Sequence, residues 1–141
     1  MKTVGLIQPN FQTGPKHLNS WYLPYTLGCL WSYVNQYKDI QDNFKIHSWI
    51  FQRPLIGDAV EQLVDCDVIF CSMYMWNINY CYKLLSTLKR INPDIIIVAG
   101  GPEIPWRDKN FFDDHPYIDS IAINEGEQAA LAVMRNIIAG E

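Results

Sequence analysis

Basic residues are scarce in this 141-residue chain, which holds 11 Lys and Arg against 15 Asp and Glu, a formal net charge of −4. No local Lys/Arg cluster offsets this balance, so the sequence lacks the electrostatic footprint of a protein that binds DNA or RNA. Long apolar runs are also missing: none approaches the length of a membrane span, and the N-terminus is not a signal peptide. We therefore expect a cytoplasmic protein with no nucleic-acid or membrane partner.

Cysteine and histidine are few, and their spacing excludes several metal sites. Cys29, Cys66, Cys71 and Cys81 form neither a CxxC nor a CxxxCxxC motif. This spacing predicts reduced thiols that pack as small apolar groups. The histidines are scattered without ligand spacing, which favours surface or supporting roles over a metal site; they are His17, His47 and His115.

Several catalytic motifs of α/β proteins are absent. The sequence has no GxxxxGK[ST] phosphate loop, no GxGxxG after the first strand and no GxSxG nucleophile elbow. A phosphoacceptor receiver needs an Asp at the end of its third strand, where this chain has Ser72. We therefore expect no catalytic residue within the chain.

The residues that are present predict one domain over positions 1–141. Hydrophobic residues make up 49% of the chain, enough for a real core at this length, and no linker, repeat or low-complexity segment interrupts them. Aromatic residues make up 13%, which fits either a large planar ligand or extra core packing.

Apolar strands alternate with helical segments along the whole chain. We expect strands at residues 3–8, 44–50, 68–72, 95–99 and 120–123, and helices beginning near residues 24, 54, 78 and 127. A polar break is expected at residues 38–43, and a short helix or irregular segment at 106–112. Unbroken apolar strands indicate a sheet covered on both faces. The order predicts an α/β fold, a doubly wound five-stranded parallel sheet of the flavodoxin-like (Rossmann-like) kind.

The strand at residues 95–99 runs directly into Gly100, Gly101 and Pro102. Open parallel sheets bind ligands beyond the carboxyl ends of their strands, and adjacent glycines let backbone approach a ligand closely. An ordinary tight turn is the alternative. Four such loops converge at this edge and carry few acid–base groups, as expected of a site that holds a large molecule. The candidate binding residues there are Pro9, Asn10, Phe11, Ser72, Met73, Tyr74, Trp76, Asn77, Gly100, Gly101, Pro102, Glu103, Asn124, Glu125 and Gly126.

In their order along residues 4–138, these segments resemble the N-terminal cobalamin-binding domain of cobalamin-dependent radical S-adenosylmethionine enzymes. The resemblance implies cobalamin as the cofactor, with the corrin ring over the carboxyl edge and the nucleotide tail between sheet and helices. It adds Tyr25 and Gly28 to the cofactor-binding set. The matching pieces are Pro24 to Gly28, similar to the family's Pro-x-x-Leu-Gly; Ser72 with Trp76-Asn77; the strand followed by Gly100 to Glu103; and Glu125-Gly126-Glu127.

Departures from the family pattern limit the chemistry. The DxHxxG motif, whose histidine binds cobalt in one branch of cobalamin proteins, is missing, which implies a histidine-off mode. Asn124 stands where the family's GEGE begins with glycine. Without CxxxCxxC this chain as given cannot cleave S-adenosylmethionine. An iron–sulfur cluster and S-adenosylmethionine would enter only with a further catalytic domain, so enzyme activity is left open.

Two other interpretations remain at this point. The chain could be a stand-alone, non-enzymatic cobalamin carrier or sensor, or a flavodoxin-like module that binds a flavin or another nucleotide cofactor or serves in protein interaction. For the cobalamin interpretation we expect that Gly101→Val abolishes cobalamin retention and leaves the fold intact.

Overall fold

The computed structural model describes residues 1–15, 18 and 20–141, so His17 lies outside the described residues. All neighbouring strands of the main sheet are parallel. This topology is the 2-1-3-4-5 order of flavodoxin-like proteins and confirms the predicted fold class. In spatial order the strands are β4 (Phe44–Ile50), β1 (Lys2–Ile7), β5 (Val68–Ser72), β6 (Ile96–Gly100) and β7 (Ser120–Ile121).

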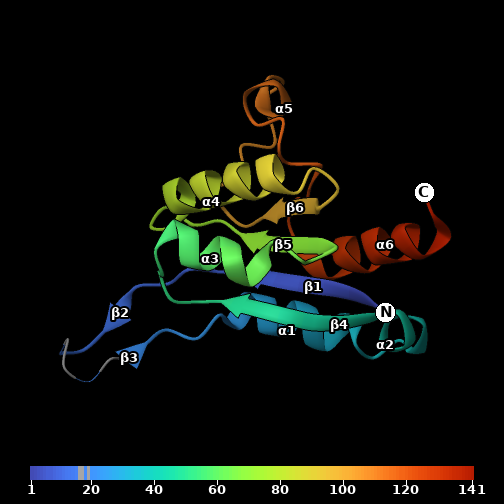
Figure 1. Cartoon of the computed structure of the whole chain (residues 1–141), viewed down its shortest axis with the longest axis horizontal. Coiled ribbons are helices and arrows are strands. Elements are labelled where there is room, and N and C mark those ends of the chain that lie inside the picture. The colour runs from blue at the N-terminus through green and yellow to red at the C-terminus, as the bar shows by residue number, and fades with distance from the viewer. Residues whose placement is uncertain (16–17, 19) are drawn as a thin grey trace.

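Helices cover both faces of this sheet (Figure 1). One face carries α1 (Tyr25–Val34), α2 (Lys38–Asn43) and α6 (Gly126–Ala139). The opposite face carries α3 (Ile56–Leu63), α4 (Ile78–Ile91) and the short α5 (Phe111–Asp114). Within the described residues, no helix is both long enough and apolar enough to cross a bilayer.

Alternating side chains of the central strand build the two cores. In β5, Val68 and Phe70 pack against the α1 and α6 side, whereas Ile69 and Cys71 pack against α3 and α4. All five residues of β5 are buried. Because both faces are covered, the strand reads as a continuous apolar run, as the sequence predicted.

Two segments differ from the sequence prediction. Residues 38–43, expected as a polar break, form α2, which is fixed by the fully buried side chain of Ile40. One apolar residue in six gives no periodic signal, so this helix is invisible to pattern analysis. The expected long loop after β1 contains an antiparallel pair, β2 (Gln12–Thr13) and β3 (Ser20–Trp21).

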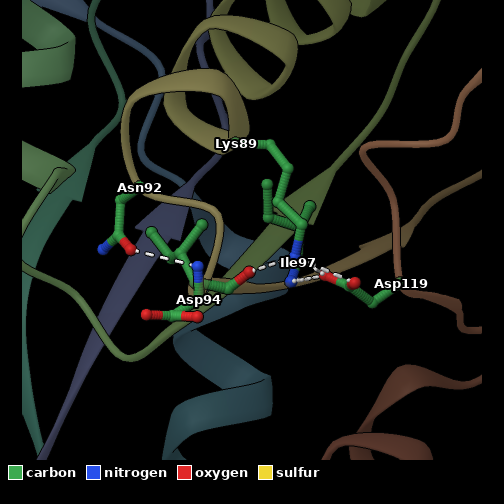
Figure 2. A network of polar contacts seen from close by, with 6 residues as sticks. Lys89, Asn92, Asp94, Ile97 and Asp119 are labelled. Atoms are coloured by element: carbon green, nitrogen blue, oxygen red, sulfur yellow. Dashed lines mark hydrogen bonds and ion pairs between the residues drawn. The ribbon is translucent and has the colours of Figure 1, made fainter.

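A lysine–carboxylate network joins β6 to the segment before β7 (Figure 2). Lys89 Nζ donates to Ile95 O at 2.6 Å and to both carboxylate oxygens of Asp119 at 2.9 Å. Asp119 Oδ2 also accepts the backbone N–H of Ile97 at 2.7 Å. The carboxylate thus satisfies a strand donor that the short β7 does not reach.

We expect Asp119→Ala to lower the free energy of unfolding by about 1–3 kcal/mol, because it leaves the Ile97 N–H and the Lys89 ammonium without their carboxylate. Asp94→Ala is the matched control: Asp94 is exposed and enters the network only through its backbone N–H, which donates to Asn92 Oδ1. Urea unfolding of both variants measures the difference. Equal stability of the two variants would show that the network contributes nothing.

The four cysteines are free thiols that differ in exposure. Burial raises the pKa of the Cys66 thiol to about 12 and holds that of Cys71 well above its usual range. Cys81 is fully buried, whereas Cys29 is partly exposed. Brief treatment of the native protein with iodoacetamide is therefore expected to alkylate Cys29 alone. Mass spectrometry of tryptic peptides checks this, and modification of Cys66 or Cys71 before unfolding would contradict it.

Candidate functional site

Small residues line up across three neighbouring strands at their carboxyl ends. The register pairs Phe70 with Val98, and two residues further on pairs Ser72 with Gly100. Ala122 continues this row next to β7, where its N–H donates to Ala99 O at 2.8 Å. Side chains two apart lie on the same face of a strand, so this row faces α1 and α6. Small side chains at Ser72, Gly100 and Ala122 therefore follow the bulky side chains of Phe70 and Val98 and leave space above the sheet.

A cavity of about 440 Å³ lies over this row, between the sheet and helices α1 and α6. We call it the α1–α6 cavity. Leu27 and Leu30 of α1 and Ala130 of α6 enclose it from the helix side. Its volume is within the range of cofactor pockets. The other lining residues are Thr26, Phe70, Cys71, Ser72, Tyr74, Val98, Gly100, Gly101, Pro102, Ile104, Trp106, Ala122, Ile123, Asn124 and Gly126.

Ser72 is the polar feature of this cavity that the fold leaves unexplained. Its residue is 3% exposed, and its Oγ has no hydrogen-bond partner among the described residues. A buried hydroxyl without a partner costs about 1–3 kcal/mol, so it is expected to be satisfied by something that enters the cavity. The Thr26 and Tyr74 hydroxyls, in contrast, share a hydrogen bond at 2.7 Å.

Exposed aromatic side chains form a rim beside the cavity. Trp76 stacks on Tyr74 with ring centroids 4.6 Å apart, and Phe11 meets Trp76 and Tyr22 edge-on at 5.6 Å and 4.9 Å. Phe11, Tyr22 and Trp76 are all exposed, as is Trp106 in the loop after β6. An apolar surface of this kind, gathered at one edge of a sheet, is typical of a binding site for a large planar group.

Two buried asparagines hold the loops that present this rim. Asn77 Nδ2 donates to Pro9 O and Ser72 O at 3.1 Å each, and its Oδ1 accepts the Tyr74 N–H at 2.8 Å. Asn10 Nδ2 donates to Tyr22 O at 3.0 Å and Leu23 O at 3.2 Å. These amides are therefore occupied within the protein. Pro9 and Met73 are buried with them, so the structure does not bring Pro9, Asn10, Met73 and Asn77 to the cavity lining.

The two adjacent glycines have different roles. Gly101 has φ +103°, and a Cβ there would lie 2.4 Å from Met73 O and 2.7 Å from Met73 N. The Gly101→Val change would therefore strain the fold itself, and the expectation that it leaves the fold intact is wrong. A Cβ on Gly100 would lie at 3.4 Å from Ala122 Cβ, so Gly100 is the position where a side chain can enter the cavity.

Tyr25 and Gly28 lie on another side of α1, in a separate apolar hollow of about 560 Å³. They fall three residues apart on a helix stripe distinct from the Leu27 and Leu30 stripe, which faces the cavity. A Cβ on Gly28 would approach only Trp49, at 3.8 Å. We call this hollow the α1–β4 groove; its lining is Leu23, Pro24, Tyr25, Gly28, Cys29, Ser32, Trp49 and Phe51.

The remaining predicted residues lie at the cavity mouth or outside it. Gly126 opens α6, where a Cβ would lie 3.7 Å from Leu30 Cδ1. Asn124 has φ 65°, a left-handed conformation that asparagine tolerates and glycine adopts freely, so it keeps the backbone shape expected of a glycine at this position. Glu103 and Glu125 are exposed and do not line the cavity.

Pattern analysis did not find the helix side of the cavity. Leu27, Leu30 and Ala130 read as ordinary core positions, and Ala122 as part of a strand. The available signal was the two-residue alternation, which places Ala122 in line with Gly100. Among the described residues, no group of three or more His, Cys, Asp or Glu could hold a metal ion. His115 instead stacks on Tyr82 at 4.1 Å and pairs through Nδ1 with the Tyr117 hydroxyl.

Comparisons with known proteins converge on one cofactor. A family model described as "B12 binding domain" matches residues 50–134. The cobalamin-dependent radical SAM methyltransferase TokK of Streptomyces tokunonensis is 34% identical over 108 residues, 77% of this chain and 16% of that protein. The 2-(S-pantetheinyl)-carbapenam-3-carboxylate methyltransferase of Streptantibioticus cattleyicolor is 32% identical, with the same coverage of 77% and 16%.

A solved structure gives the same fold. The apo, SeMet-labelled cobalamin-dependent S-adenosylmethionine radical enzyme OxsB superposes with a TM-score of 0.70 at 22% identity, over 100% of this chain and 19% of that one. The chain thus spans about 16% of the length of the two curated methyltransferases and 19% of the OxsB chain.

The two glycines make a testable contrast. Gly101→Ala is expected to lower the free energy of unfolding by about 2–4 kcal/mol, because its Cβ overlaps the Met73 backbone at a left-handed φ. Gly100→Ala is expected to change stability by less than about 1 kcal/mol, because its Cβ enters the cavity at ordinary contact distance. Thermal and urea unfolding compare the two, and equal losses would contradict the assignment of roles.

Proposed function

This chain belongs to the B12-binding domain family, and we propose that it seats the corrin ring of cobalamin at the carboxyl edge of its sheet for methyl or electron transfer. Cobalamin is its cofactor, and the chain is related to cobalamin-dependent radical S-adenosylmethionine methyltransferases. We further propose that residues 1–141 act as one cobalamin-binding domain, and that the protein works in the cytoplasm.

The unpaired Ser72 hydroxyl carries the proposal, because this buried polar group belongs to the wall of a cavity of about 440 Å³, where the nucleotide tail would supply its partner. The tail would enter between α1 and α6 and lie over the row of Ser72, Gly100 and Ala122. The small side chains of this row leave the room, and the apolar walls from Leu27 and Leu30 favour an aromatic base.

The aromatic rim supports the position proposed for the corrin. Phe11, Tyr74 and Trp76 are held against one another, and the Trp76 backbone carbonyl accepts a hydrogen bond from Arg53 of the loop after β4. This contact ties the loops at the ends of β4 and β5 together. A preformed apolar rim costs little ordering on binding and keeps water from the face of the ring that it covers.

The described histidines support a mode without a protein histidine on cobalt. His47 is exposed on β4, and His115 is stacked against Tyr82 on the other side of the sheet. Neither lines the α1–α6 cavity. When bound, cobalamin supplies a cobalt centre that carries a methyl group or an electron. The residues of this chain would bind the cofactor, orient it and exclude water, and the reaction itself would need a catalytic domain.

Cobalamin binding is tested by mixing the protein with hydroxocobalamin and separating free vitamin by gel filtration. We expect red pigment to elute with the wild-type protein. Gly100→Val should raise the dissociation constant by about tenfold or more, because the added side chain occupies the cavity where the tail would lie. Ultraviolet–visible titration gives the constants.

Gly57→Val is the matched control, since a Cβ at Gly57 meets nothing within 4 Å. Circular dichroism and thermal unfolding establish that both variants are folded. Absence of pigment on the wild-type protein would overturn the proposal, and so would unchanged affinity in a folded Gly100→Val variant. Binding of flavin mononucleotide in place of cobalamin would favour the flavodoxin-type alternative.

A further inference from the structure

The side chains inside the α1–α6 cavity offer very little hydrogen bonding. Phe70, Val98 and Ala130 are apolar and 3% exposed or less. The thiol of Cys71, whose pKa is raised by burial, is directed to Cys81 in the core on the opposite side of the sheet. The Ser72 hydroxyl is thus the buried side-chain group of this lining that lacks a partner among the described residues.

Side chains near the mouth of the cavity do not add to these buried hydrogen-bonding groups. The Thr26 and Tyr74 hydroxyls are bonded to each other. Trp106 is 51% exposed and Asn124 is exposed, so both side chains are in contact with solvent. Beyond them, the side chains that line the cavity offer apolar contacts and one hydroxyl.

From this inventory, and resting on the proposed function, we infer that the cavity selects corrinoids whose lower base is a benzimidazole and discriminates against those with a purine. Once detached from cobalt, dimethylbenzimidazole has a single ring nitrogen that accepts a hydrogen bond, and otherwise presents carbon. That inventory matches one hydroxyl among apolar side chains. Adenine has an exocyclic amino group and several ring nitrogens, most of which would lose water here without a side-chain partner.

The test compares three probes in the intact chain: cobalamin, its adenine-containing counterpart pseudocobalamin, and cobinamide, which has no nucleotide tail. Free corrinoids differ in how strongly the base binds their own cobalt. A ratio of dissociation constants measured in one protein therefore mixes that difference with the selectivity of the cavity. Comparing this ratio between protein variants removes the contribution of the free corrinoids, because they are the same in each titration.

Val98→Thr adds a hydroxyl to the cavity with little change in shape. We expect it to lower the ratio of the pseudocobalamin to the cobalamin dissociation constant by about five- to tenfold, since one purine group gains a partner. Val68→Thr is the matched control: Val68 is equally buried on the same face of the sheet, but does not line the cavity. The control should leave the ratio unchanged, and cobinamide binding should be the same in all three proteins.

Ala130→Ser places a hydroxyl on the helix side of the cavity and serves as the second variant if Val98→Thr does not fold by circular dichroism. An unchanged ratio in a folded cavity variant overturns the inference and leaves the proposed function standing. Cobinamide binding as tight as cobalamin binding also overturns it, since the tail then contributes nothing. If none of the three probes binds, the proposed function fails and the inference fails with it.

Discussion

The site depends on a change in side-chain size, from bulky to small residues, at the same level of three parallel strands. Two helices pack on Phe70 and Val98, and these side chains hold α1 and α6 away from the sheet. One row further on, the side chains shrink to a hydroxymethyl, a hydrogen and a methyl at Ser72, Gly100 and Ala122, but the helices continue in the same direction. The gap cannot close without losing the packing below it, so the floor of the cavity follows from the core.

The loops at this edge are fixed by polar groups that face inward, which leaves their aromatic side chains free to face outward. Asn77 and Asn10 satisfy backbone groups of neighbouring loops, and Gly101 adopts a left-handed conformation that lets its backbone pack against Met73. Such buried, satisfied amides are costly to disturb, so the rim around Trp76 is preorganised. The protein thus separates the residues that build the edge from those that are proposed to touch the cofactor.

The flavodoxin-like fold class and the parallel sheet could be predicted from the sequence, because strands alternate with helices and unbroken apolar runs report burial on both faces. The position of individual side chains could not. Tyr25 and Gly28 fall in a matching segment, yet helix geometry directs them to the α1–β4 groove. Asn10 and Asn77 are polar residues at the carboxyl edge of the sheet, yet their amides are hydrogen-bonded to the backbone. Helix α2 was not predicted from the sequence, because a single buried residue, Ile40, fixes it and gives no periodic pattern.

The central claim is that the α1–α6 cavity receives the nucleotide tail, which must then leave the cobalt. Electron paramagnetic resonance of cob(II)alamin bound to the protein tests this most directly, because the unpaired electron couples to a nitrogen that is coordinated to the metal. The account predicts that splitting from the nitrogen of the tail base disappears when the cofactor binds and that Gly100→Val does not produce this change. Persistent nitrogen splitting in a complex with wild-type protein would contradict it.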